Sequence, residues 1–105
     1  MSIQLVMTTE SGEGRVFDIH DNRTTIGRRR SCDLHVALPS VAPLHCEITV
    51  KEGIIKLMNR DPDAHTLHNG TEIDAVQLEN SDRVKIGPVE FTVIISEEET
   101  VIKRH

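Results

Sequence analysis

The amino-acid sequence predicts an all-β fold, a β-sandwich or barrel of short strands. Its 105 residues are enough for one ordinary domain. Through most of the chain apolar side chains alternate with polar ones, the period-2 pattern of strands that bury one face. Turn-forming residues (Gly, Pro, Asn, Asp, Ser) recur at short, even intervals between these runs, as in sandwiches and barrels. No stretch has a good 3.6-residue apolar period, so we expect little helix.

The expected strands follow one another with only short interruptions. The first run contains Ile3, Leu5 and Met7, and the longest alternation is that of Val89 to Ile95. Val, Ile, Leu and Thr are plentiful, and β-branched side chains suit a pleated surface. In chain order, the expected strands cover residues 3–7, 16–19, 24–26, 33–38, 45–50, 54–58, 83–86 and 89–95.

The alternation stops after Ile95, where a run of acidic residues begins. We therefore expect residues 1–95 to form the domain and residues 96–105 to form an acidic C-terminal tail or linker. Val101 and Ile102 are apolar exceptions in that tail, and they either dock back on the domain or belong to a linker. The start at Met1 and the charged end suggest the N-terminal module of a longer protein, or a piece cut from one.

Composition limits the partners. The formal net charge is −5, and Phe17 and Phe91 are the sole aromatic residues, so we expect no nucleic-acid partner. No apolar run approaches membrane-spanning length and no signal peptide precedes the fold, so we expect no membrane partner. Cys32 and Cys46 are expected to be reduced thiols of an intracellular protein, although a disulfide between them is left open.

Motifs for catalysis are weak in this chain. Neighbours on a strand point to opposite faces, so His45 and Cys46 cannot act together as base and nucleophile. The pair His65 and His68 lacks a second pair at metal-ligand spacing. The chain has no Walker-type glycine-rich loop and no Gly-x-Ser-x-Gly motif. We expect no enzyme, no cofactor and no metal; an enzyme that uses His45 or the His65/His68 pair is the third alternative.

Basic residues crowd one short region that includes Arg23, Arg28, Arg29 and Arg30. Arg28 follows Gly27, and a guanidinium on a glycine-bounded turn offers two parallel N–H donors and a permanent charge to a phosphate. A basic region on an acidic domain favours a local anion contact over a long polyanion track. The plain alternative is a solvated turn.

Several short motifs occur in an order and spacing that together resemble a forkhead-associated (FHA) domain. The similarity runs from about Val16 to Ile95. It implies a two-sheet β-sandwich of about eleven strands (SMAD/FHA-like) that binds phosphothreonine peptides through loops at one end and is not an enzyme. The motifs are Ile26-Gly27-Arg28, Cys32-Asp33-Leu34, His45-Cys46-Glu47-Ile48, Asn69-Gly70, Leu78 to Asp82, and Ile86-Gly87.

The resemblance assigns roles to residues around Arg28, and two positions depart from the family pattern. Arg28 matches the phosphate-contacting arginine. His45 matches a scaffold histidine that braces the loops and touches no ligand, and Gly27 is also assigned to the scaffold. Ala42 stands where the family has a serine that grips the phosphate. Pro43, which follows, has no backbone N–H to donate.

The second departure concerns Asn69-Gly70. The family has a peptide-binding Asn-Gly-like element and, some residues later, a structural hairpin. Asn69-Gly70 could be either; the spacing favours the hairpin, where a type I′ turn is expected. Ala64 then takes the place of the peptide-binding asparagine, and His65 follows it. In the opposing interpretation, cationic donors from His65, His68, Arg29 or Arg30 replace the lost contacts.

These departures predict a degraded pocket in which phosphothreonine peptides bind at low affinity or not at all. The retained role is then a contact with protein partners, above all a homodimer. Val6, Ile54, Met58 and Ile94 fall on the faces that alternation assigns to solvent, and gathered on one sheet they would form a self-association surface. An active phosphothreonine-binding module with a remodelled pocket is the alternative.

The cellular setting also comes from the resemblance. The stretch Leu38-Pro39 … His45-Cys46 is similar to that of N-terminal FHA domains in DNA-damage checkpoint mediator proteins. This resemblance implies a nuclear signalling protein of the DNA-damage response.

Overall fold

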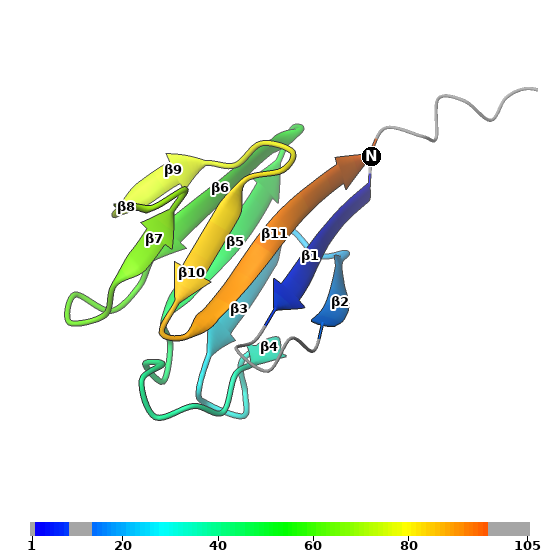
Figure 1. The fold of residues 1–105 in the computed structure, drawn as a ribbon. Coiled ribbons are helices and arrows are strands. Elements are labelled where there is room, and N and C mark those ends of the chain that lie inside the picture. Colours follow the sequence, from blue (N-terminus) through cyan, green and yellow to red (C-terminus); the bar gives the residue numbers. More distant parts are fainter. Residues whose placement is uncertain (1, 9–13, 97–105) are drawn as a thin grey trace, which may run out of the picture.

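Two β-sheets packed face to face make up the molecule in the computed structural model, which describes residues 2–8 and 14–96 (Figure 1). These described residues form eleven strands. They are β1 (Ser2–Thr8), β2 (Gly14–Ile19), β3 (Arg23–Gly27), β4 (Leu34–His35), β5 (Cys46–Lys51), β6 (Ile54–Asn59), β7 (Thr66–His68), β8 (Thr71–Glu72), β9 (Ala75–Gln77), β10 (Arg83–Ile86) and β11 (Val89–Ser96).

Groups of consecutive strands belong to one sheet before the chain crosses to the other. The six-stranded sheet has the order β2-β1-β11-β10-β7-β8, and the five-stranded sheet has the order β4-β3-β5-β6-β9. The pairing of β3 with β4 is parallel, whereas the other registered pairs are antiparallel. This arrangement confirms the predicted all-β, two-sheet sandwich. Residues 2–8 and 14–96 contain no helix long and apolar enough to cross a membrane.

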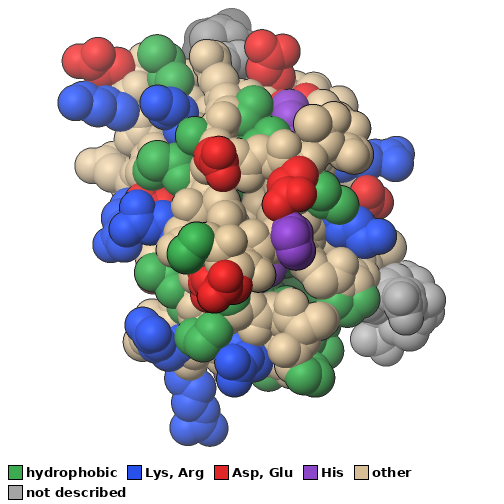
Figure 2. All heavy atoms as spheres, turned by 90° about the vertical axis from the view of Figure 1, so that its left-hand side faces the viewer, with side chains coloured by type: hydrophobic (Ala, Val, Ile, Leu, Met, Phe, Trp, Pro, Cys, Tyr) green, Lys and Arg blue, Asp and Glu red, His purple; other side chains and the backbone are tan. Residues whose placement is uncertain are grey.

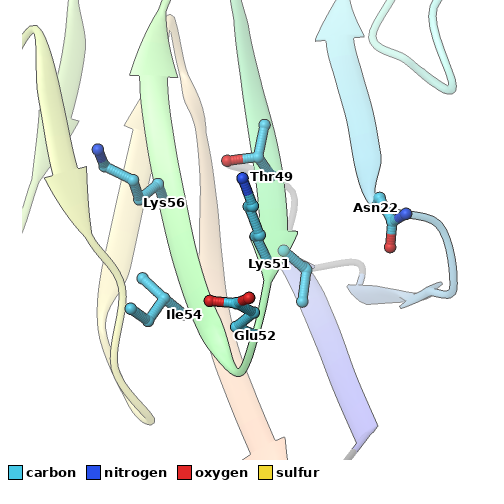
Figure 3. A pocket seen from close by; sticks show the side chains of 7 residues that line it. Asn22, Thr49, Lys51, Glu52, Ile54 and Lys56 are labelled. Carbon is cyan, nitrogen blue, oxygen red and sulfur yellow. The ribbon is translucent and has the colours of Figure 1, made fainter.

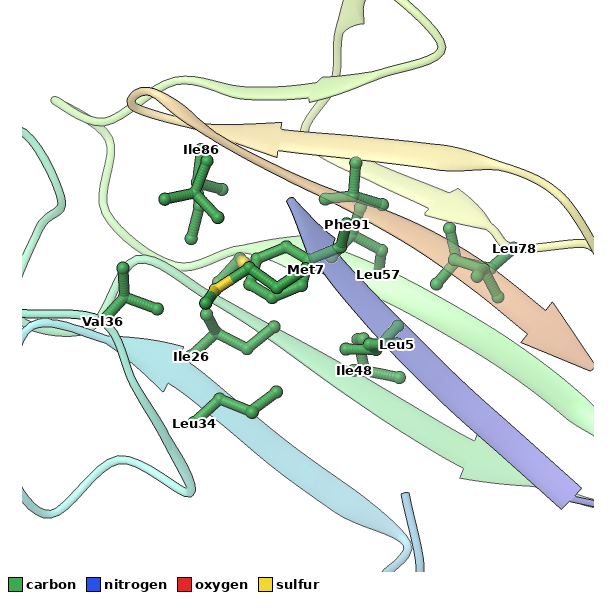
Figure 4. Close-up of a cluster of buried hydrophobic side chains, with 14 of the residues drawn as sticks. Leu5, Met7, Ile26, Leu34, Val36, Ile48, Leu57, Leu78, Ile86 and Phe91 are labelled. Carbon is green, nitrogen blue, oxygen red and sulfur yellow. The ribbon is translucent and has the colours of Figure 1, made fainter. Parts of the chain in front are cut away.

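The space between the sheets is filled by the inward side chains of the alternating runs (Figure 4). Phe91, Leu5, Ile26, Ile48 and Leu57 are among the largest fully buried side chains. The core is otherwise aliphatic, and its stability comes from apolar surface removed from water. Each strand's second face therefore points to solvent, which leaves two broad sheet surfaces for contacts.

One predicted strand is shorter than the alternation suggested. Residues 33–38 were expected to be extended, but β4 covers only Leu34–His35. The Val36 N–H donates to the Gly27 carbonyl at 2.8 Å, and the Leu38 N–H donates to the Val36 carbonyl at 2.9 Å, so the chain turns there. Val36 lies in this loop but its side chain is buried. The large apolar residues there therefore recur at every second position, as they would in a strand.

Three short strands between residues 66 and 77 were not predicted separately, because two or three residues cannot display a period. Their turn was predicted. Asn69 and Gly70 have φ of +50° and +89°, and His68 pairs with Thr71 across them. Positive φ at both central residues is what a type I′ hairpin requires.

Both cysteines are buried free thiols. The Cys32 thiol donates to the Pro43 carbonyl at 3.3 Å. Burial raises the pKa of the Cys46 thiol to about 12, so that thiol stays neutral at physiological pH. At the C-terminus, β11 continues to Ser96, one residue beyond the predicted domain limit. The rest of the predicted tail, with Val101 and Ile102, lies outside the described residues.

Candidate functional site at the loop end of the sandwich

Three loops meet at one end of the sandwich and enclose a shallow pocket. They follow β3, β4 and β6, and Figure 1 shows the first two extending beyond the strands at its lower edge. The pocket has a volume of about 240 Å³. It brings together four residues that the sequence assigned to the phosphopeptide site, namely Arg28, Ala42, Pro43 and Ala64. The complete lining is Arg28, Pro39, Ser40, Val41, Ala42, Pro43, Asp61, Asp63 and Ala64.

Gly27 lets two of these loops approach each other. A Cβ atom at this position would lie 2.3 Å from the Pro43 carbonyl oxygen, closer than any real Cβ contact. Beside Gly27, the Arg28 N–H donates to the Ala42 carbonyl at 2.9 Å and the Arg29 N–H donates to the Pro43 carbonyl at 3.1 Å. The glycine is therefore required for close backbone approach, not for a left-handed conformation.

His45 connects the loops on both sides of the pocket. Its side chain is buried, its Nδ1 accepts from the Ala42 N–H at 3.1 Å, and its Nε2 lies 2.9 Å from the His65 carbonyl. These partners assign the proton to Nε2, because a carbonyl can only accept. Cys46 lies in the apolar core instead, so the two neighbours face opposite ways and do not form a nucleophile–base pair.

Arg28 is the cation of the pocket. Its Nε donates to the Val41 carbonyl at 2.9 Å, which holds the guanidinium against the pocket wall. The terminal nitrogens of the fork extend beyond that contact. Arg29 and Arg30 follow on the same loop and are exposed, but they do not line the pocket.

Apart from Ser40, which supplies a hydroxyl, the other lining residues are poor partners for a phosphate. Ala42 and Ala64 present methyl groups, and the Ala42 N–H is already bonded to His45. Asp61 and Asp63 also line the pocket, so it holds two carboxylates beside one guanidinium. A phosphate dianion placed there would meet like charges at close range.

Asp61 and Asp63 flank Pro62 in a turn and were not among the predicted site residues. The turn contact exists, since the Asp63 N–H donates to the Asp61 carboxylate at 2.8 Å. Their second role, as pocket lining, was missed. The sequence did contain one indication of this role: Asp63 directly precedes Ala64, which was predicted to lie in the peptide site.

A second hollow, of about 310 Å³, adjoins the first and shares three of its residues. It adds the ammonium group of Lys85. The Ser40 hydroxyl lies close to Gly87, because a Cβ atom added at that glycine would be 2.8 Å from it. Its lining is Ser40, His45, Asp63, Ala64, His65, Leu67, Lys85 and Gly87. Neither Ser40 nor Lys85 was among the predicted site residues.

His65, which precedes β7, and His68, the last residue of β7, are each bound to a different carboxylate. His65 Nδ1 lies 2.6 Å from the Glu72 carboxylate, and His68 Nε2 lies 2.8 Å from the Asp82 carboxylate. Within residues 2–8 and 14–96, no group of three or more His, Cys, Asp or Glu side chains could hold a metal ion.

Asn69 ties the β7–β8 hairpin to the segment that precedes β10. Its side-chain oxygen accepts from the Arg83 N–H at 2.8 Å, and its amide nitrogen donates to Asp82 at 3.3 Å. Burial pushes the pKa of Asp82 up, but hydrogen bonds from His68, the Glu79 N–H and Asn69 outweigh it and leave the pKa below its ordinary value. Asn69 and Gly70 therefore lie away from the pocket lining.

The four apolar residues expected to form one self-association surface are split between the two sheets. Val6 and Ile94 lie on β1 and β11 of the six-stranded sheet, whereas Ile54 and Met58 lie on β6 of the five-stranded sheet. The condition for one surface made by all four, that they gather on one sheet, is therefore not met. Sequence alternation assigns a side chain to the solvent side of its strand, but not to a sheet.

Comparison with protein families places this geometry among known domains. The family model of the FHA domain matches residues 24–87, which include all three pocket loops. The chain is 36% identical over 87 residues to the proliferation marker protein Ki-67 of Mus musculus. That match covers 81% of this chain but 3% of the mouse protein.

Solved structures share the fold at low sequence identity. The FHA domain of the CT664 protein from Chlamydia trachomatis has a TM-score of 0.83 at 14% identity, over 91% of this chain and 99% of that one. The N-terminal FHA domain of Rad53p from S. cerevisiae, in complex with a phosphothreonine peptide, has a TM-score of 0.77 at 16% identity, over 93% and 98% of the two chains. The same sandwich is thus present in domains whose sequences differ widely.

Proposed function

This chain belongs to the FHA domain family, and we propose that it is a protein-interaction module in which phosphothreonine recognition at the loop end is weak or absent. The observation that carries the proposal is the lining of the pocket beside Arg28. Ala42 and Ala64 offer methyl groups there, and Asp61 and Asp63 offer carboxylates. One guanidinium beside two carboxylates, with the Ser40 hydroxyl as the neutral side-chain donor of the lining, makes a weak anion site.

The expected loss of affinity is large. A hydrogen bond to a charged group contributes roughly 1.5–3 kcal/mol. Two missing contacts therefore weaken binding by about two to four powers of ten if their effects add. The carboxylates lower the affinity further through like-charge repulsion.

Titration of the domain with a degenerate phosphothreonine peptide library tests this proposal. We expect no saturable binding at micromolar concentrations. Substitution of Ala42→Ser with Ala64→Asn should restore phosphate-dependent binding, because the missing hydroxyl and amide return beside Arg28. The matched control adds Arg28→Ala to the same pair and should remove the gain. Phosphate-dependent binding by the native domain that is lost in Arg28→Ala would overturn the proposal.

A remodelled phosphothreonine pocket is the second candidate, and the adjoining hollow supports it. Ser40 and Lys85 line that hollow and supply a hydroxyl and an ammonium group of the kind that a phosphate requires. In this case the native domain binds phosphothreonine peptides, and Lys85→Gln or Ser40→Ala abolishes binding while Arg28→Ala has less effect. The same library titration thus separates the two candidates.

For the retained role, we favour self-association through the outer face of the six-stranded sheet. Val6 lies opposite Val16 in the β1–β2 register, and Val16 is 58% exposed. Ile94 lies opposite Gln4, one diagonal position from Val6. An apolar patch on an edge and its neighbours suits a two-fold contact.

Sedimentation equilibrium at tens of micromolar tests the self-association. We expect a dimer, and Val16→Lys should convert it to a monomer because it buries a charge at the contact. Thr71→Lys, which adds the same charge on the β7–β8 hairpin, is the control. A native domain that stays monomeric at these concentrations rules the dimer out.

The cellular role remains a proposal of its own, since the chain spans 3% of the curated relative that it matches. The resemblance to N-terminal domains of checkpoint mediators supports a nuclear protein of the DNA-damage response. Imaging of the tagged full-length protein before and after DNA breakage tests this. Exclusion from the nucleus in both conditions would contradict it.

A further inference from the structure

The outer face of the five-stranded sheet carries a row of polar and cationic side chains. Strand pairing places Arg23, Thr49, Lys56 and Gln77 opposite one another on β3, β5, β6 and β9. Lys51 lies further along β5, opposite the exposed Ile54. Residues that are far apart in the sequence thus form one surface, which the chain order alone does not show.

Cations on this face outnumber the carboxylates that pair with them. Glu47 has a nearly buried side chain and accepts from Arg23 Nε at 2.9 Å, while Arg60 Nε lies 3.6 Å from the same oxygen. One carboxylate therefore balances only one of two guanidinium groups. Among the described residues, neither Lys51 nor Lys56 has a carboxylate within ion-pair distance of 4.0 Å.

The acids near this face offset only part of the excess. Asp33, at the β4 edge, accepts from the Thr25 N–H and hydroxyl at 2.9 and 3.0 Å. Glu52 lies at the β5–β6 turn, beside the lysines. In Figure 2, most blue Lys and Arg side chains lie along the left margin, with a red acidic side chain beside the uppermost of them, and other red side chains and the purple histidines lie nearer the centre and right.

A hollow of about 800 Å³ lies between these cations, at the end of the sandwich away from Arg28. In Figure 3 the amino groups of Lys51 and Lys56 lie in the upper part of the view, at about the level of Thr49. Ile54 lies lower, nearer the turn between β5 and β6. Ile54 is 47% exposed, so an aliphatic surface lies beside the ammonium groups. The lining consists of Asn22, Thr49, Val50, Lys51, Glu52, Ile54 and Lys56.

We propose that this face, centred on Lys51, Ile54 and Lys56, binds an acidic segment of a partner protein that also carries an aliphatic side chain. The glutamate or aspartate side chains of the segment pair with the ammonium groups, and its aliphatic side chain packs on Ile54. Charge complementarity supports this occupant, because an excess of cations here stands on a chain of net charge −5.

Two other occupants fit less well. A two-fold contact between copies through this same face would place the lysines of one copy near those of the other. Nucleic acid would meet the acidic remainder of the domain and find no exposed aromatic side chain on which a base could stack. The proposal does not depend on the state of the Arg28 pocket, which lies at the opposite end.

The test uses a defined acidic peptide and backbone amide NMR signals of the full chain. The probe is an acetylated, amidated octapeptide, Glu-Glu-Ile-Glu-Glu-Val-Glu-Glu, and its counterpart has glutamine in place of every glutamate. We expect saturable shifts of the amide signals of residues 49–56 with the acidic peptide only, and a marked weakening in 0.5 M salt.

Matched variants then locate the binding. Lys51→Gln and Lys56→Gln should each weaken binding up to about fivefold, and the pair of substitutions should weaken it more. Arg83→Gln removes the same charge from the six-stranded sheet and should leave the Kd unchanged. Ile54→Ser should weaken binding without changing its salt dependence.

Three results would overturn the proposal. The first is the absence of shifts at millimolar peptide. The second is a set of shifts centred on the Arg28 loop, which would assign the peptide to the other end. The third is binding that appears only after removal of residues 97–105, which would make Glu97-Glu98-Glu99 of this chain the occupant in place of a partner.

Discussion

Two layers of the loop end differ in how strongly the fold constrains them. The inner layer contains Gly27, His45 and Thr66, which are buried in close contacts. Thr66 donates its hydroxyl to Asn59 at 2.8 Å, and no buried side-chain N or O atom of the described residues lacks a partner. The outer layer contains Arg28 and Ala64, and its side chains face a pocket open to solvent.

The difference shows that the support of a binding site and its chemistry are separate. The inner contacts fasten loops to the sandwich, so changing them costs stability. The outer side chains could be replaced with little effect on the fold, which is how a recognition surface can change its ligand while the architecture stays. The following predictions test that separation, from the largest expected change in stability to the smallest.

His45→Ala should have the largest effect. It removes two hydrogen bonds and leaves the Ala42 N–H and the His65 carbonyl without partners, each at a cost of ~1–3 kcal/mol. We expect the free energy of unfolding in urea to fall by about 3 kcal/mol. His35→Ala, at an exposed position, is the control. A fall no larger than that of the control would mean that the inner layer does not brace the loops.

Gly27→Ala should follow, with a loss of about 1–3 kcal/mol, because its Cβ would displace the Pro43 carbonyl. The control is Gly14→Ala, where the nearest atom to a Cβ, the Met7 carbonyl oxygen, lies 3.6 Å away. Thermal unfolding of both variants measures the difference. Equal melting temperatures would show that the loops adjust freely.

Asp82→Asn should lower stability by about 1–2 kcal/mol at neutral pH. The pKa of Asp82 is lowered in the folded state, so its contribution is present above the ordinary aspartate value of about 3.9 and is lost as pH falls through the folded value. Urea unfolding at pH 7 and at pH 3 measures the gap, which should shrink at the lower pH. Asp74→Asn is an exposed control. A gap that stays constant with pH would assign the effect to packing.

Ala42→Ser with Ala64→Asn should have the smallest effect on stability, within about 0.5 kcal/mol of the native domain. Both positions line an open pocket and are only half-buried. Urea unfolding measures this change in the same variant that is tested for peptide binding. A loss above 1 kcal/mol would contradict the separation of the two layers.

Several features were predictable from the chain because they depend on neighbouring residues. Alternation predicted most strands, and Asn69-Gly70 predicted its own turn. Other features depended on partners distant in the sequence. The loop after His35 has the sequence pattern of a strand, because Val36 is buried there and its N–H donates to the Gly27 carbonyl. Asp63 lines the pocket because its turn lies beside the loop that contains Ala42.

The sequence by itself determined the fold class and the family, and it predicted the departure at Ala42, because period, turn chemistry and motif spacing are local properties. Only the tertiary structure decided which side chains share a surface. It separated Val6 from Ile54, placed Asp63 beside Arg28, and aligned Lys56 with Thr49. The physical reason is that strand pairing and loop packing are set by long-range contacts. The alternation of apolar and polar residues indicates which side chains are buried, but not which residues lie next to them.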